Sequence, residues 1–383
     1  MGFTRPSVQA ELDRFYKAIA RSSTSFQSVT KSAFTQSRKK LKSHAFIELS
    51  NQQLAYFKEK APHQSNKNGK RIVAIDGSLL NLPHTAEIEK VFGGVTNQHE
   101  KVVSARCSFA YDVSNQLVLD SKIAPRRSCE KDLAVGHLKS LDPVTDILVF
   151  DRGYPSHWLM GLLAKKGFKF CFRLSTAWKK AHKLMDQESD IDWTLVRAAD
   201  REWGKLKKYG LSKTLEGLRL VSFPLTSGEK EVLVTNIDRD DYSISDLQKL
   251  YQLRWGVEEG YKTFKKTLHI EHFTGRTAQS IEQDFYARVF MLNMASMIRS
   301  QGVDTMINKS GKKHHQQANK TQVLAKIKDF LTDLFYSNQL GKIIKQLLKI
   351  LEKRLDIIRL GRSFPRPKTS SRRRSKIINS KGI

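Results

Sequence analysis

The most constraining feature of this sequence is the run over residues 246–268, whose periodicity predicts one amphipathic helix. At about 100° per residue, Tyr251, Arg254, Glu258 and Lys265 fall on one narrow stripe. A carboxylate between two cations at the edge of a buried face can bind a metal, and the cations can bind phosphate. The apolar residues that predict this buried face recur every three or four positions: Leu250, Leu253, Val257, Tyr261, Phe264 and Leu268.

The balance of charge points to a polyanionic partner. The 383 residues include 67 Lys and Arg against 38 Asp and Glu, a formal net charge of +29. Nucleic acid is the first candidate for such a partner. A basic protein with a solvated surface, such as a ribosome-associated factor, is the alternative. The hydrophobic content of 39% is enough for a globular chain of two or three domains.

Several protein classes are disfavoured by what the sequence lacks. Cys107, Cys129 and Cys171 are odd in number and not closely paired, which argues against a disulfide framework and a structural zinc site. No stretch approaches the roughly 18 consecutive apolar residues of a membrane span. The first residues carry no apolar signal segment. We therefore expect no membrane partner and a reducing compartment, either a nucleus or a bacterial cytoplasm, where the protein would be nucleoid-associated.

The chain divides into five expected regions. The first is helical and basic, with a cation cluster at Arg38, Lys39, Lys40 and Lys42, and is a hypothetical DNA-end-binding region. The last is helical with a polar linker and a basic tail, and its helix over residues 323–359 either packs on its own domain or dimerises as a coiled coil. The expected regions are residues 1–70, an α/β core at 71–175 and 241–300, a mainly β insertion at 176–240, and residues 301–383.

Within the core, short apolar runs predict strands, and each is followed by turn residues. The first strand is expected to end in a turn at Asp76-Gly77-Ser78. The run over residues 146–150 is apolar almost throughout, as expected for a buried central strand that ends at Asp151. The helix with Glu258 is expected to begin near Ser243 or Ser245. The remaining predicted elements are strands at 102–113, 117–123 and 168–174, helices at 129–141, 156–166 and 280–300, and a hairpin at 218–225 and 230–237.

Three acids stand where a fold could bring them together. Asp76 and Asp151 each follow a strand, and Glu258 lies on the later helix. Functional residues of open α/β sheets gather beyond the carboxyl ends of strands, so the two aspartates can meet if their strands are parallel and close. Three carboxylates could hold two Mg²⁺ ions, because hard oxygen ligands suit Mg²⁺ or Mn²⁺ rather than zinc. Each acid also has an ordinary explanation, as a turn residue or as the partner of Arg254 in a helical ion pair.

A family signature coincides with the helical stripe. Tyr251, Arg254, Glu258 and Lys265 match a pattern of Tyr, two residues, Arg, three residues, Glu, six residues and Lys. The chain thereby resembles the DDE transposases of bacterial insertion sequences, specifically the IS-four family. The contexts AIDGSLLNLP and DRGYPS are similar to those of the family's two aspartates. The resemblance extends over residues 71–299.

The resemblance implies a fold and a site. The fold is α/β, with an RNase H-like catalytic core of a mixed five-stranded sheet flanked by helices, and with a mainly β insertion. The metal-binding catalytic residues would be Asp76, Asp151 and Glu258, with two Mg²⁺ ions that Mn²⁺ can replace. The residues in contact with DNA phosphate would be Tyr251, Arg254 and Lys265.

The resemblance also implies a reaction and partners. Water would cleave the phosphodiester bond at each end of an insertion sequence, and the freed 3′-hydroxyls would be joined to target DNA, in cut-and-paste transposition. The partners would be double-stranded DNA, at the inverted-repeat ends and the target, and a second copy of the chain in a homodimer.

Other functions stay open on the sequence alone. The chain could be a catalytically inactive or regulatory DNA-binding protein derived from a transposase. A structural RNA-binding or ribosome-associated protein would show no metal dependence and would leave the spacing of the four signature residues unexplained. Trp255 could handle an unstacked base or could simply pack.

Overall fold

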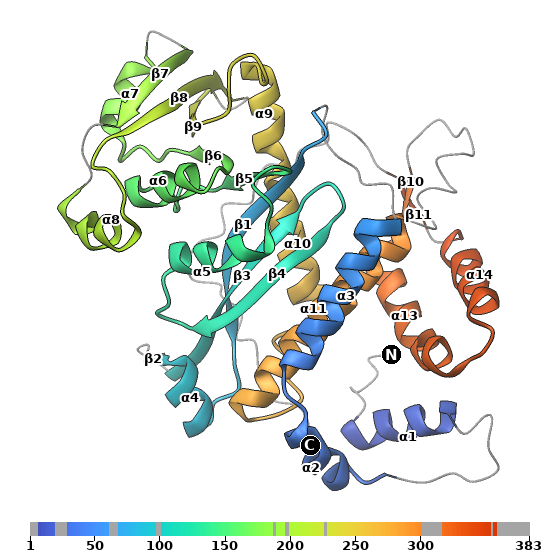
Figure 1. Cartoon of the computed structure of the whole chain (residues 1–383). Helices are drawn as coiled ribbons and strands as arrows, with labels where there is room; N and C mark the ends of the chain where they lie inside the picture. Colours follow the sequence, from blue (N-terminus) through green and yellow to red (C-terminus); the bar gives the residue numbers. More distant parts are fainter. Residues whose placement is uncertain are drawn as a thin grey trace. The chain divides into compact units, whose positions relative to one another are not determined.

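The structure is a computed structural model in which the chain forms two compact units (Figure 1). The helical unit comprises Met1–Ala61, Asn81–Val103 and Phe264–Ile383, and the sheet unit comprises Pro62–Leu80 and Ser104–Thr263. The division into five regions stays a prediction. The structure describes residues 7–19, 29–60, 68–96, 101–186, 189–195, 199–225, 228–300, 316–353 and 355–357.

The sheet unit is built on one mixed sheet. Its strands are β1 (Arg71–Asn81), β3 (Lys101–Asp112), β4 (Leu117–Pro125), β5 (Asp146–Phe150), β6 (Lys169–Arg173), β7 (Asp190–Leu195), β8 (Leu215–Pro224) and β9 (Lys230–Thr235). They lie in the order β4-β3-β1-β5-β6-β9-β8-β7. β1, β5 and β6 are parallel neighbours, whereas β4 pairs antiparallel with β3 and β9 pairs antiparallel with β6.

The sheet is larger than the five strands expected for the core. With β2 (Gly94–Thr96), which pairs with the first residues of β3, the described sheet has nine strands. The insertion supplies β7, β8 and β9, which extend the sheet beyond β6 instead of forming a separate layer. The central residues of β6 are fully buried, so β6 is an interior strand and β9 satisfies the backbone groups of its outer edge. The predicted hairpin is confirmed as β8 and β9.

An ion pair helps to set the register of β1 and β5. Arg71 lies opposite Asp146, and its guanidinium donates to both carboxylate oxygens at 2.8 Å. Such a fork is directional and disfavours a shifted register. The parallel pairing of the two strands begins at this ion pair and ends where Ile75 lies opposite Phe150.

The predicted turn at Asp76-Gly77-Ser78 is wrong, because β1 continues through these residues to Asn81. Gly and Ser are typical of turns, but here the strand remains bonded to β3 after its pairing with β5 has ended. The buried thiol of Cys107 on β3 donates to the carbonyl of Ser78 at 3.2 Å. Leu80 is also fully buried. Asp76 therefore lies inside a strand, at the point where its parallel neighbour stops.

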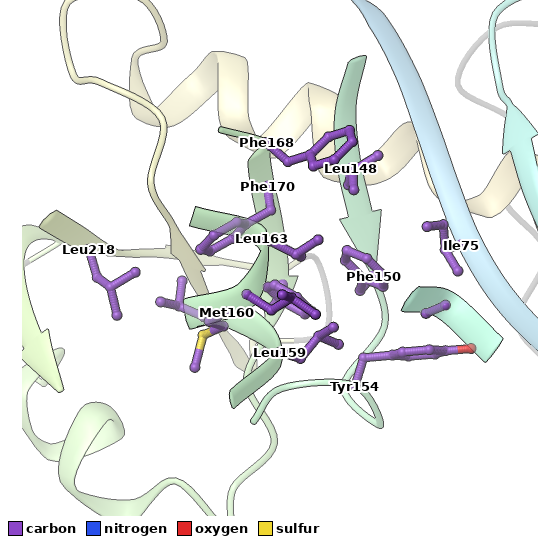
Figure 2. Packing of buried hydrophobic residues seen from close by; sticks show 14 of the residues in the cluster. Ile75, Leu148, Phe150, Tyr154, Leu159, Met160, Leu163, Phe168, Phe170 and Leu218 are labelled. Carbon is purple, nitrogen blue, oxygen red and sulfur yellow. The ribbon is translucent and has the colours of Figure 1, made fainter. Parts of the chain in front are cut away.

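Helices cover this sheet and close a hydrophobic core. The predicted helices are confirmed as α5 (Glu130–His137) and α6 (His157–Lys165), and the insertion adds α7 (Lys179–Leu184) and α8 (Trp203–Tyr209). Figure 2 shows Leu159 and Leu163 of α6 on the side of Phe150 of β5, and Met160 on the side of Leu218. The rings of Phe150 and Phe172 stack with centroids 4.4 Å apart. This packing holds the carboxyl end of β5 in place.

The predicted helix over residues 246–268 is interrupted. It consists of α9 (Ile244–Leu253), α10 (Trp255–Lys262) and a π-helical turn at Thr263–Thr267, with a break at Arg254. Its start is confirmed at Ser243, which forms a capping box with Asp246. Leu253 is 45% exposed, so it does not belong to the buried face, and a constant 100° per residue does not hold past Thr263.

The helical unit contains the two ends of the described chain. Its elements are α1 (Val8–Ile19), α2 (Lys31–Lys40), α3 (His44–Lys60), α4 (Ala86–Phe92), α11 (Ala278–Ile298), β10 (Gln316–Ala318), α13 (Lys320–Tyr336), α14 (Leu340–Leu351) and β11 (Leu355–Ile357). Helices α3 and α11 lie side by side (Figure 1).

One long helix over residues 323–359 is not observed. The chain breaks at Ser337, the C-cap of α13, and returns as α14, which packs against α13. Their apolar residues Val323, Ile327, Leu347 and Leu351 are buried in a cluster within this unit. The interpretation as a helix that packs on its own domain is therefore favoured over a coiled coil. Most of the predicted linkers and the basic tail from residue 363 lie outside the described residues.

One member of the predicted cation cluster has a structural role. Arg38 donates to Gln283 at 2.6 Å, to the carbonyl of Ser280 at 3.0 Å and to Asp284 at 2.8 Å, all on α11. Its neighbours Lys39 and Lys40 are exposed. Arg38 is thus an anchor between α2 and α11 and is not free to meet DNA.

Arg38→Ala is expected to lower the free energy of unfolding by about 2–3 kcal/mol, because the 11%-exposed side chain of Asp284 loses its closest cation. Urea denaturation measures this loss. Lys39→Ala, the exposed neighbour, is the control and should stay within about 0.5 kcal/mol of the parent chain. Equal small losses in the two variants would contradict the anchoring role.

Within the described part of the chain, no helix has both the length and the apolar character needed to cross a membrane.

Candidate active site

Two of the predicted acids lie level on neighbouring strands of the sheet unit. Ile75 of β1 pairs with Phe150 of β5, and the two strands are parallel. Asp76 and Asp151 directly follow this pair in the sequence, so they lie beside each other. This is the edge of the sheet where sites of open α/β folds are found. The requirement that their strands run parallel and adjacent is met.

The carboxyl of Asp76 is in an unfavourable place for a negative charge. The pKa of Asp76 is raised from its ordinary 3.8 to about 6, and burial is the largest cause. The charges of Asp151 and Glu258 contribute to this rise, whereas the amide of Gly77 and the charge of Arg254 oppose it. The charges of Asp151 and Glu258 therefore both act on Asp76, and a cation placed beside Asp76 would relieve this repulsion.

The turn after β5 fixes the side chain of Asp151. Its Oδ1 accepts a hydrogen bond from the amide of Gly153 at 2.8 Å. A Cβ atom at residue 153 would lie 3.2 Å from the same oxygen, so glycine permits this close approach. Tyr154 then returns to the core, where its ring packs 5.3 Å from that of Phe150 (Figure 2).

Arg254 contacts two other residues of the predicted helical stripe, Tyr251 and Glu258. Arg254 donates to Glu258 at 2.9 Å, and its guanidinium lies 5.7 Å from the ring centre of Tyr251. Tyr251 is only 4% exposed, and burial raises the pKa of its hydroxyl. The side chain of Arg254 is 8% exposed and that of Glu258 is 37% exposed. The carboxylate is therefore the most accessible group of the three.

Two further residues of this segment stand apart from that contact. Lys265 lies in the π-helical turn and belongs to the helical unit, so its part in the site stays a prediction. Trp255 is 44% exposed, with the Arg254 guanidinium 5.3 Å from its ring centre. Trp255 is therefore not a core residue, and both of its predicted roles stay open.

The chemistry of these donors fits a hard divalent cation, since each is a carboxylate and none is a thiol or imidazole. As placed, however, the described residues include no group of three or more His, Cys, Asp or Glu side chains that could hold a metal ion. In this arrangement Oε1 of Glu258 accepts from Arg254, and one oxygen each of Asp76 and Asp151 accepts from a backbone amide.

Sequence reasoning missed several neighbours of Asp76. The hydroxyl of Tyr154 is buried without a hydrogen-bond partner among the described residues, and its pKa is raised by burial and by Asp76. Glu130, paired with Arg106, lies close enough that a Cβ at Gly77 would be 3.2 Å from it. Only Tyr154 had a signal in the sequence, as the last residue of the DRGY turn.

Comparison with known proteins agrees with this geometry. Residues 67–294 match the family model described as transposase DDE domain. A transposase for insertion sequence element IS231F from Bacillus thuringiensis subsp. israelensis is 22% identical over 344 residues, which cover 78% of this chain and 68% of that protein.

Among solved structures, a cryo-EM structure of the piggyBac transposase synaptic complex with hairpin DNA is similar, with a TM-score of 0.42 and 10% identity. The match covers 73% of this chain and spans 57% of the length of that one. Since the family model covers more than half of the 383 residues and contains Asp76, Asp151 and Glu258, the chain belongs to the DDE transposase family.

Proposed function

We propose that this protein cleaves phosphodiester bonds at the ends of an insertion sequence and joins the freed 3′-hydroxyls to target DNA. The observation that carries the proposal is the placement of Asp76 and Asp151 on adjacent parallel strands, with Glu258 acting on Asp76. The five strands β4, β3, β1, β5 and β6 would be its RNase H-like core. The net charge of +29 suits a DNA partner.

The three carboxylates are the residues that would hold two Mg²⁺ ions, or Mn²⁺ in their place. Such ions supply a nucleophile at neutral pH and stabilise the leaving oxygen of the displaced strand. Asp76 stands on a strand and Asp151 directly follows one, so little reorganisation is needed on that side. The apolar core of Phe150, Tyr154 and Leu159 behind them limits water to the open face.

Arg254 has two tasks in this proposal. Without DNA it neutralises Glu258 at 2.9 Å. When a DNA phosphate arrives, the guanidinium turns from the carboxylate to the phosphate oxygens, and Glu258 is released toward Asp76. Tyr251 supports the guanidinium from its buried position, and Lys265 contacts a further phosphate. A guanidinium suits such an exchange because carboxylate and phosphate present similar oxygen pairs to it.

The experiment incubates the full chain with linear DNA that carries the inverted repeats flanking its gene. We expect strand cleavage at the repeat ends with Mg²⁺, none with excess EDTA, and recovery on adding Mn²⁺. DNA of shuffled sequence is the control. Binding without cleavage in either metal would instead favour a regulatory DNA-binding protein, and cleavage that continues in EDTA would exclude the metal-dependent mechanism.

Two copies of the chain would bridge the two ends of the element. The mass of the complex on paired repeat ends, measured in solution, tests this. A mass that corresponds to one chain per pair of ends would contradict it.

A further inference from the structure

We propose that Tyr261 is a positioning residue that holds the helix with Glu258 in register with the strand of Asp76. The inference rests on the function proposed above for these two carboxylates. Tyr261 follows Glu258 by three residues, about one helical turn. A bond from Tyr261 to β1 is therefore made close to Glu258 along α10.

The tie is a directional hydrogen bond. The hydroxyl of Tyr261 donates to the backbone carbonyl of Asp76 at 2.8 Å. Its ring is 6% exposed and stacks on Phe109 of β3, with centroids 4.4 Å apart and planes 6° apart. The stack alone would allow the ring to slide, whereas the hydroxyl fixes its position along β1.

Two glycines bring the helix close enough for this bond. A Cβ atom at Gly260 would lie 3.0 Å from the ring of Tyr111, and one at Gly256 would lie 3.3 Å from Val113. Both partners are on β3 or directly after it. One face of α10 therefore packs closely against the side chains of β3 and the residue after it. A larger residue at position 256 or 260 would prevent this close packing.

The same carbonyl of Asp76 has a second hydrogen-bonding neighbour. The hydroxyl of Ser108 lies 3.3 Å from it and 2.9 Å from Nε2 of His137, whose Nδ1 lies 2.8 Å from Asp120. Ser108 and His137 are fully buried, so these two side chains cannot reach a substrate. Their effect is to immobilise the backbone of Asp76.

The carbonyl and the carboxyl of Asp76 belong to one residue, so a shift of the first moves the second relative to Asp151. Through Tyr261, the same shift is coupled to Glu258. A phenylalanine at position 261 would keep the stack on Phe109 but would leave a buried carbonyl with a weaker set of donors. Tyr261→Phe therefore separates alignment from packing.

The test measures Mn²⁺ binding to the full chain, with and without repeat-end DNA, by the electron paramagnetic resonance signal of free Mn²⁺. We expect Tyr261→Phe to weaken Mn²⁺ binding by roughly five- to tenfold, as one lost hydrogen bond predicts. Ser108→Ala should weaken it less. The control is Tyr209→Phe, which removes a tyrosine hydroxyl from a ring that stacks on Trp158.

The readouts distinguish the two proposals. In the variant Tyr261→Phe, the Mg²⁺ concentration for half-maximal cleavage should rise while DNA affinity stays unchanged. If Tyr261→Phe binds Mn²⁺ as the parent chain does, and Asp151→Ala does not bind it, the positioning role is overturned and the proposed function stands. If the parent chain binds no Mn²⁺ in either condition, or Asp151→Ala binds it equally well, the carboxylate assignment fails and the positioning role fails with it.

Discussion

Asp151→Ala is expected to slow strand cleavage at the repeat ends by at least about 10³-fold, because a lost metal ligand removes several kcal/mol of transition-state stabilisation. DNA affinity should stay within about twofold, since phosphate contacts come from cations. A gel-based cleavage assay and a binding isotherm at the same salt concentration measure both quantities. Only a loss confined to cleavage is consistent with the assignment.

A matched control separates this effect from the loss of any aspartate. Asp192 of the insertion has an 83%-exposed side chain that pairs with Arg239. Asp192→Ala should cleave at the rate of the parent chain. Undiminished cleavage by Asp151→Ala, or an equal loss in Asp192→Ala, would remove Asp151 from the site.

Asp76→Asn is expected to abolish cleavage and yet to stabilise the metal-free protein. Burial raises the pKa of Asp76 to about 6, so its ionised form destabilises the folded state. At 1.36 kcal/mol per pKa unit, the gain at pH 8 is about 3 kcal/mol at most, and solvent access to this partly exposed side chain reduces it to about 1–2 kcal/mol. Asparagine keeps the carbonyl oxygen that accepts from Gly77.

The pH dependence gives the sign of this effect. Because the folded-state pKa lies above the unfolded-state value, the parent chain loses stability as pH rises from about 4 to about 6 and regains none above that range. The stability difference between Asp76→Asn and the parent should therefore be small near pH 4 and complete above pH 6. Urea denaturation in EDTA measures it. A difference that does not change with pH, or that favours the parent at pH 8, would contradict the burial of this charge.

Local patterns predicted the elements that depend on nearby residues. The apolar run over residues 146–150 is β5 without adjustment, and α5, α6 and the hairpin of β8 and β9 also lie where expected. Their apolar periodicity and turn residues are contained within each segment. The extension of β1 past Asp76 was missed because it depends on pairing with β3, more than 20 residues later in the chain. The addition of the insertion strands to β6 was missed for the same reason.

The site residues also divide into contacts that local spacing predicts and contacts that depend on distant parts of the chain. Tyr251, Arg254 and Glu258 were predicted to meet, and their contact follows from helical spacing alone. Burial of Tyr251 and of Arg254 depends on what surrounds the helix, which spacing does not reveal. Tyr261 appeared in the sequence only as one more apolar position. Its hydroxyl gains a partner 185 residues away in the chain, which no local pattern indicates.

The union of the insertion with the main sheet has a mechanical consequence. Residues Cys171, Phe172 and Arg173 of β6 are paired with Thr235, Val234 and Leu233 of β9, so backbone hydrogen bonds cross the junction. A segment joined in this way cannot swing as a hinged flap without tearing the sheet. A force on the insertion would instead be transmitted through the paired strands β9 and β6 to β5, which is followed by Asp151.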